Sequence, residues 1–350
     1  MSSRQDQRVA EGATAIQSQR DTIVNQGLSS NDFRSIVESL FDQMPKFIET
    51  ALTAMDVRLN AFEDSLIKRF DHDATAKREA FSDPDFLHIV IEAQRAYART
   101  GDPETHGTLV DLIAKRSSED TRSRRAFAIN EAITVVSRLT KNDMSELAFA
   151  FYARHTKNPA INDLSSFCAN LNAYIYELLD DLETDRDSYE YLVSQRCTAI
   201  SALEISLLDI WRQVYPGLFM KGFSAEEVDK IVEDSTPDVK FLLTPSEFDP
   251  SRRRPRAISL EELLSIYRTP SVSEEHVRRI WSQAIASLAD DDAIVQKLKP
   301  ECPRIEEVIY KWNSSSLKSL DLTTIGKVIG HARLTQIPTF ENADLSIWIK

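Results

Sequence analysis

Four arginines lie within five positions of a proline-rich segment at 244–258. They are Arg252, Arg253, Arg254 and Arg256. A guanidinium group binds phosphate or carboxylate through paired hydrogen bonds, and burying an unpaired charge costs several kcal/mol. We therefore expect an exposed loop that engages an anionic surface: a phosphate ligand, an acidic partner protein or an anionic lipid headgroup. The alternative is that solvent alone surrounds these side chains.

A second pair with chemical potential is Arg99 and His106, which are separated by six residues. The spacing resembles that of small all-helical ribonucleases of the HEPN type, in which an arginine positions an RNA phosphate and a histidine assists attack by the 2′-hydroxyl. The structural alternative is that Arg99 covers a helix C-terminus, where a cation is favoured, while Gly101, Asp102 and Pro103 form the next turn. We favour this structural role and predict no catalytic residue.

Residues that bind metals or cofactors form no recognisable motif. Three cysteines occur without a C-x-x-C pair, and the six histidines show no H-E-x-x-H pattern. Neither G-x-G-x-x-G nor the P-loop pattern is present. The acidic run at 180–187 lacks the spacing of a calcium loop and is typical of a solvated turn. Asp238 and Lys240 form a D-x-K tripeptide without a clear upstream acidic partner. We therefore predict no metal and no cofactor.

The composition is that of a folded, acidic chain. The 350 residues include 55 acidic and 42 basic side chains, which gives a formal charge of −13. This surplus repels nucleic-acid phosphates, so general nucleic-acid binding is disfavoured. The dispersed cysteines favour a reducing compartment, and no stretch approaches the ~20 apolar residues that span a bilayer. We expect a cytoplasmic protein that reaches a membrane only through a partner.

Apolar residues recur every three or four positions from Phe33 to Phe70, which is the period of a helix. Pro45 should end a first short helix, because proline removes a backbone donor and disfavours helical geometry in the preceding residue. A long helix should then run from about 46 to 78. Two interpretations of its stripe are open: a coiled-coil interface with another copy of the chain, or packing within a bundle of the same chain. The predicted interface residues are Leu52, Met55, Leu59, Phe62 and Leu66.

The prolines are distributed unevenly, since only four of the thirteen precede position 216. Long helices are therefore permitted in the first part and interrupted in the second. We predict a disordered tail at 1–28, a long helical stalk or hairpin at 29–80, a helical bundle at 81–216 and a smaller helical module at 217–350. A strand-like run at 239–243 adds a minor β element. The predicted fold class is all-α or nearly so, and a solenoid is second because no fixed repeat is present.

Two stretches carry a resemblance to a known family: SDPDFLHIVIEAQRAYARTGDPETHGTLVDLIAKRS at 82–117, and LTTIGKVIGHARL with ADLSIWI within 322–349. They resemble an uncharacterised bacterial family of mostly helical proteins that carry locus-style labels. The resemblance implies a bacterial cytoplasmic protein and an accessory-genome or phage-defence setting. It implies no activity, substrate or catalytic residue.

These observations favour a non-enzymatic binding, sensor or scaffold component of a bacterial system, with antiphage defence as the implied setting. Such a component would act through self-association and through a partner protein or an anionic surface. The alternative function is an all-helical, HEPN-like ribonuclease that uses Arg99 and His106.

Overall fold

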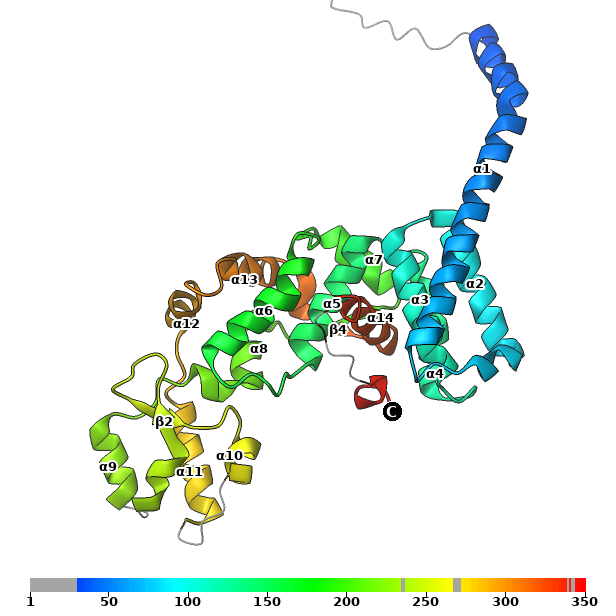
Figure 1. Cartoon of the computed structure of the whole chain (residues 1–350). Coiled ribbons are helices and arrows are strands. Elements are labelled where there is room, and N and C mark those ends of the chain that lie inside the picture. The colour runs from blue at the N-terminus through cyan, green and yellow to red at the C-terminus, as the bar shows by residue number, and fades with distance from the viewer. Residues whose placement is uncertain (1–29, 234–236, 267–271, 339, 341–343) are drawn as a thin grey trace, which may run out of the picture. The chain divides into compact units, whose positions relative to one another are not determined.

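The computed structural model describes residues 30–233, 237–266, 272–338, 340 and 344–350. The tail predicted at 1–28 lies outside these residues. The protein is 68% helical, and within the described ranges it has 14 helices and two small antiparallel sheets of two strands each (Figure 1). The prediction of an all-α fold is confirmed.

The α-helices follow one another with short connections. Their bounds are α1 Ser30–His72, α2 Pro84–Thr100, α3 Pro103–Ser117, α4 Arg124–Val136, α5 Lys141–His155, α6 Leu164–Leu179, α7 Arg186–Ser194, α8 Leu207–Val214, α9 Ala225–Glu233, α10 Leu260–Ile266, α11 Glu274–Ile285, α12 Asp291–Leu298, α13 Ile305–Asn313 and α14 Thr324–Leu334.

Each strand is three residues long. One pair joins strands that are far apart in the sequence, and the other pair joins consecutive strands. The strands are β1 Thr198–Ile200, β2 Leu243–Pro245, β3 Arg253–Pro255 and β4 Leu320–Leu322. β1 pairs with β4, and β2 pairs with β3 with Thr244 opposite Arg254. Most of the strand-like run predicted at 239–243 instead belongs to a 3₁₀ helix, Pro237–Leu242, and only Leu243 enters β2. Four further 3₁₀ helices are η1 Arg78–Ser82, η2 Pro216–Phe219, η4 Ser316–Ser319 and η5 Leu345–Ile347.

The starts and stops of α2 and α3 follow from local chemistry. Pro84 and Pro103 occupy the first turns, and the preceding Asp83 and Asp102 side chains accept hydrogen bonds from backbone N–H groups of those turns. Gly101 separates the two helices with φ 66°, a left-handed conformation that suits glycine. The turn predicted at Gly101, Asp102 and Pro103 is confirmed.

The expected break at Pro45 is wrong, because α1 runs without interruption through this residue. Proline removes one hydrogen bond and crowds the preceding turn, at a cost of about 3 kcal/mol. That cost is local, and several turns on each side keep their remaining hydrogen bonds. The helix ends at His72, earlier than the predicted 78, where the Asp73 carboxylate accepts hydrogen bonds from the Thr75 N–H and hydroxyl and forms a turn.

The chain divides into two compact units, residues 1–54 and 55–350. In the described part of the first unit, Met44, Phe47, Ile48 and Leu52 of α1 are each about half exposed, from 46% to 56%. In the second unit, Met55 is 40% exposed and Leu59 is intermediate.

The predicted oligomer interface is wrong for Phe62 and Leu66, which are buried within the second unit itself. Phe62 packs with Tyr97 of α2 and His106 of α3, at ring-centroid distances of 6.0 and 5.8 Å. These residues therefore follow the intrachain-bundle interpretation, because both are buried in the main core of the same chain.

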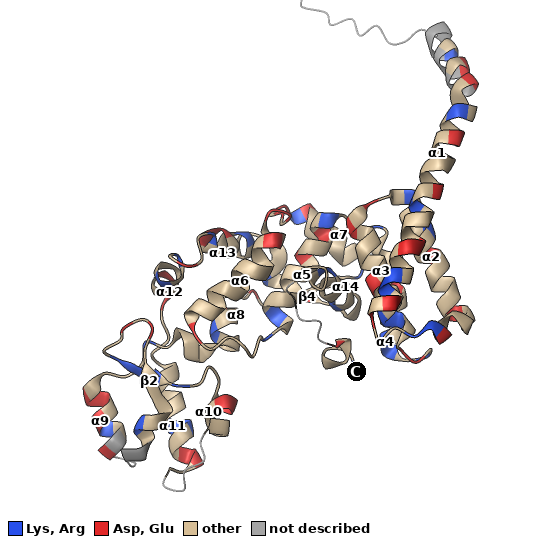
Figure 2. Ribbon diagram, in the orientation of Figure 1, with Lys and Arg blue, Asp and Glu red and all other residues tan. Residues whose placement is uncertain are grey.

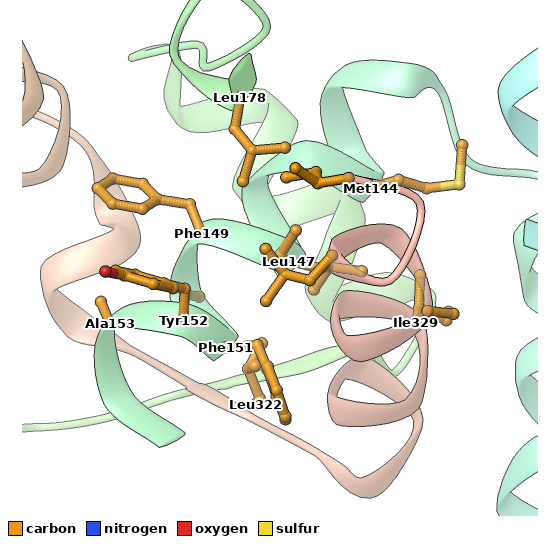
Figure 3. Packing of buried hydrophobic residues seen from close by; sticks show 14 of the residues in the cluster. Met144, Leu147, Phe149, Phe151, Tyr152, Ala153, Leu178, Leu322 and Ile329 are labelled. Atoms are coloured by element: carbon orange, nitrogen blue, oxygen red, sulfur yellow. The ribbon is translucent and has the colours of Figure 1, made fainter. Parts of the chain in front are cut away.

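The main hydrophobic core lies around α5, whose residues Met144 to Ala153 are almost all buried. Figure 3 shows Leu147 and Phe151 of α5 beside Ile329 of α14 and Leu322 of β4. Close contact between α5 and α14 depends on Gly330, since a Cβ at this position would lie 2.5 Å from the Leu147 carbonyl oxygen. Leu345 and Ile349 also join this core.

A second hydrophobic cluster is formed by residues between Met220 and Ala284, including Leu242 and Trp281. The main core takes up residues on both sides of it, from 62 to 219 and from 289 to 349 together with Ile258. The predicted module at 217–350 does not coincide with the second hydrophobic cluster. The cluster begins near 217, but residues from 289 onward belong to the main core, which was not predicted.

Candidate anion-binding cleft

A cleft of about 1170 Å³ lies on the segment from 221 to 297. Residues of α9, α11 and α12, the stretch 221–223 and the β2–β3 connection line it. Five of its side chains are cationic: Lys221, Lys230, Arg252, Arg279 and Lys297. Only two are acidic, Glu227 and Asp249. This cleft, called the basic cleft below, is therefore a local positive surface on a chain of net charge −13.

Arg252 is held in place by the wall of the basic cleft. Its Nε and Nη2 donate to the Gly222 carbonyl oxygen at 2.9 and 2.5 Å, and its Nη2 lies 3.4 Å from Glu227 Oε2. These hydrogen bonds use Nε and Nη2 of the guanidinium, and Nη1 has no hydrogen-bond partner among the residues that the structure describes. A guanidinium fixed in this way loses little freedom when it binds an anion.

Gly222 fixes the position of the carbonyl that holds Arg252. Its φ is 80°, and a Cβ there would lie 2.3 Å from the Arg253 carbonyl oxygen. Its N–H donates to the Ser287 hydroxyl, and the neighbouring Lys221 N–H donates to the Ser287 carbonyl. Only glycine suits this left-handed position and close approach.

The lysines of the basic cleft differ in how they are neutralised. Lys221 Nζ lies 2.7 Å from Asp290 Oδ2, and this hydrogen bond lowers the pKa of Asp290 to about 2. Lys230 and Lys297 are exposed and form no ion pair with any residue that the structure describes. These two ammonium groups are therefore available to an anion from solution.

The four predicted arginines do not form one exposed loop, and Figure 2 shows the basic segment beside β2. Arg253 and Arg256 are exposed as expected. Arg254 is only 4% exposed, and its Nη2 donates to Glu247 Oε1 at 2.9 Å. The prediction of exposure is wrong for Arg254, because β3 turns alternate side chains to opposite faces and Glu247 supplies a counter-charge inside.

The sequence prediction found Arg252 and missed the other four cations of the basic cleft. Lys221, Lys230, Arg279 and Lys297 are spread over three helices and a connection. Each one looks like an ordinary solvated residue of an amphipathic segment. Only a weak indication of these cleft residues was present in the sequence. The apolar faces of α9 and α11 show that Lys230 and Arg279 lie on the opposite, solvent-facing sides of these helices, but not that they lie near each other.

Arg99 and His106 lie in different surroundings. Arg99 is exposed and lines a cleft of about 330 Å³ between α2 and α4, where its Nη2 lies 3.5 Å from the Ser137 carbonyl oxygen. His106 stacks on Tyr97 at 4.4 Å, and burial lowers its pKa. His106 is not among the residues that line the Arg99 cleft.

Arg99 lies in the last turn of α2, at the helix C-terminus as expected, and Arg58 of α1 supplies a second cation there. Arg58 Nη1 donates to the carbonyl oxygens of Ala98 and Arg99 at 2.9 and 3.0 Å. The favourable position for a cation at this helix C-terminus is therefore shared by Arg99 and a side chain of α1.

A second group of charges, called the buried ion network below, links α1, α3 and α14. Asp111 of α3 contacts Lys115 Nζ at 2.6 Å and Arg69 Nη2 at 2.8 Å, and Lys115 Nζ lies 3.1 Å from His331 Nδ1. Burial opposes ionisation of Asp111, but Lys115 and Arg69 hold the pKa of this carboxyl below its usual value. Burial lowers the pKa of Lys115.

Other kinds of site have little support in the described ranges. These residues contain no group of three or more His, Cys, Asp or Glu side chains placed to hold a metal ion. No helix among them is both long and apolar enough to span a bilayer. Cys168, Cys197 and Cys302 are buried free thiols, and the acidic run at 180–187 supplies Asp180 and Asp181 to ion pairs with Arg304 and Lys141.

The fold and the basic cleft together define an all-α protein with a polar recess in its C-terminal half. A family model matches residues 27–349, and the chain belongs to this uncharacterised family, for which no activity is assigned. The expectation of such a family is confirmed. No curated protein and no solved structure has significant similarity to the chain.

Proposed function

We propose that this protein is a non-enzymatic binding component that holds an anionic group of a ligand or partner in the basic cleft. The observation that carries the proposal is the convergence of five cationic side chains from separate segments in one recess. Clustered cations in an otherwise acidic chain cost electrostatic repulsion, and a bound anion offsets that cost.

The charge distribution in the recess supports this role. Glu227 and Asp249 are the acidic lining residues, and each is engaged by a neighbouring serine: Ser224 N–H bonds to Glu227 and Ser251 donates to Asp249. Arg252 is oriented by Gly222, while Lys230 and Lys297 stay open to solvent. The recess thus combines one oriented guanidinium with two unpaired ammonium groups, a set suited to phosphate or carboxylate.

We further propose that the protein acts in the cytoplasm of a bacterium, as a sensor or scaffold in antiphage defence, and that it self-associates through α1. Support for the setting comes from the family resemblance. Support for self-association comes from the exposed apolar residues Met44, Phe47, Ile48, Leu52 and Met55, since apolar side chains of this size are favourably removed from water.

The binding proposal is tested by calorimetry with inorganic tripolyphosphate as the probe. We expect the double variant Lys230→Glu, Lys297→Glu to lose about 100-fold or more in affinity, because two attractive contacts become repulsive. Lys299→Glu is the matched control, because Lys299 is exposed nearby and pairs with Glu306 outside the recess. Equal affinity in all three proteins would refute anion binding at this site.

The alternative function, a HEPN-like ribonuclease, is less well supported, since Arg99 lines a small cleft to which His106 does not contribute. A catalytic acid or base contributes about 10²–10⁴-fold to rate. RNA cleavage by the purified protein that disappears in Arg99→Ala, His106→Ala would establish the nuclease. We expect no such cleavage, and we expect the double variant to keep its biological activity.

A further inference from the structure

The basic cleft has an apolar side as well as a charged one. Phe223, Ile231, Phe248 and Leu288 line it together with the cations. Phe223 is almost fully buried in the second hydrophobic cluster, whereas Phe248 is half-buried. A site for a bare inorganic anion has no use for these side chains, because phosphate is recognised by donors and charge alone.

The aromatic ring and the oriented guanidinium belong to the same connection. Phe248 and Arg252 both lie between β2 and β3, where Asp249 accepts hydrogen bonds from the Ser251 N–H and hydroxyl and closes the turn between them. The Phe248 N–H is bonded to the Ser246 hydroxyl. The turn thus holds an aromatic ring, which lines the cleft and also packs against the main core, a few residues from the oriented guanidinium.

The size of the recess restricts the ligand. Its volume of about 1170 Å³ reaches the upper end of small-molecule sites, which run to about 1,000 Å³. A single phosphate or carboxylate would leave most of it empty. A ligand with a flat ring and several phosphates would place the ring on Phe248 and the phosphates among Arg252, Lys230 and Lys297.

We infer that the ligand of the basic cleft is a nucleoside polyphosphate. This inference rests on the proposed function, because it names the class of anion that the cleft holds. Nucleobases stack on aromatic rings whatever their identity, so the geometry selects the class and not one base. The polyphosphate supplies the negative charge, and the base accounts for the aromatic lining.

The test is calorimetry on the full chain with ATP, GTP, CTP and UTP, compared with inorganic tripolyphosphate and adenosine. We expect nucleoside triphosphates to bind about ten-fold or more tightly than tripolyphosphate, which is the usual scale of one stacking contact. Phe248→Leu should remove this advantage and leave tripolyphosphate affinity unchanged, whereas Phe248→Tyr should keep it. Lys230→Gln with Lys297→Gln should weaken both probes, and Lys299→Gln should weaken neither.

The other outcomes separate the two proposals. If tripolyphosphate binds as tightly as the nucleotides, or if Phe248→Leu changes nothing, the nucleotide inference is overturned and anion binding stands. Binding to phosphatidylserine vesicles without nucleotide binding has the same consequence. If no probe binds at millimolar concentration, both proposals fail. Circular dichroism of Phe248→Leu and Phe248→Tyr verifies that both variants are folded.

Discussion

The buried ion network and the basic cleft both gather cations, but their counter-charges differ. In the network, Arg69 and Lys115 share Asp111 at hydrogen-bonding distance inside the second unit. In the cleft, Lys230 and Lys297 face solvent without a described ion-pair partner. Buried charges need partners within the fold, whereas exposed ones can wait for a ligand. Internal neutralisation, more than local charge density, therefore distinguishes the structural cations of the network from the cations that we propose to bind a ligand in the cleft.

Removal of Asp111 tests whether the buried ion network stabilises the folded protein. We expect Asp111→Ala to lower the free energy of unfolding by about 3–5 kcal/mol, because it leaves the largely buried Lys115 without its carboxylate and leaves the half-buried Arg69 only its pair with Asp73. Glu190→Ala, which removes the exposed partner of Arg186, should cost less than about 1 kcal/mol. Urea denaturation of both variants measures the difference, and equal costs would remove the structural role of the network.

The arginines near β3 include one buried and two exposed side chains, so the effect of burial on a cation can be measured within a few residues. Arg254→Ser should cost roughly 2–3 kcal/mol, because it leaves the partly buried Glu247 without its cation. Arg253→Ser and Arg256→Ser should each stay within about 0.5 kcal/mol, since both side chains are exposed. Thermal unfolding of the three single variants measures these losses of stability. Similar losses in all three variants would contradict a structural role for Arg254 that Arg253 and Arg256 lack.

This region also shows why sequence alone could not complete the site. Charge density pointed to the segment that contains Arg252, which lines the cleft. It could not tell Arg254 from Arg253, because that distinction depends on which face of β3 meets Glu247. The remaining cations of the cleft come together only through the packing of α9, α11 and α12, and such tertiary proximity leaves no local pattern.

The helices were more predictable than the site, because their signals are local. Asp83 with Pro84 and Asp102 with Pro103 mark helix starts through hydrogen bonds to the next few residues. The helix break predicted at Pro45 was wrong because a helix as long as α1 tolerates the loss of one hydrogen bond. The apolar stripe of α1 likewise could not show that Phe62 is covered by Tyr97 while other members stay exposed.

Glu146 is a buried carboxyl that forms no ion pair with any residue the structure describes. The fully buried carboxyl accepts hydrogen bonds from Ser188 and from the Glu183 N–H, and burial raises its pKa to about 8. The folded state then holds a proton that the unfolded state releases above its ordinary pKa of about 4.3. Stability should therefore fall as pH rises from about 4.5 to 8.

Glu146→Gln should remove this dependence, because the amide does not ionise. We expect the variant to gain roughly 2 kcal/mol over the native protein at pH 8 and little at pH 4.5, which corresponds to part of the shift in pKa. Denaturant titrations at the two pH values measure the gain. A variant with the same pH profile as the native chain would show that Glu146 is ionised in the fold.

The smallest expected effect concerns the exposed part of the α1 stripe. Leu52→Glu with Met55→Glu should keep circular dichroism and thermal stability nearly unchanged, because both side chains are exposed. The same variant should lower the mass measured by light scattering if these residues join two copies. Phe62→Glu serves as the contrast and should unfold the region, since it places a charge in the core. A monomeric native protein would remove self-association from the proposal.

The most direct test of the account is to locate a bound anion. A crystal of the full chain soaked with inorganic tripolyphosphate should show the anion in the basic cleft, within hydrogen-bonding distance of Arg252 and beside Lys230 and Lys297. The same soak of Lys230→Glu, Lys297→Glu should leave the cleft without it. An anion bound only at the exposed Arg253 and Arg256, or an unchanged anion in the double variant, would contradict the claim that unpaired cations of this cleft form the binding site.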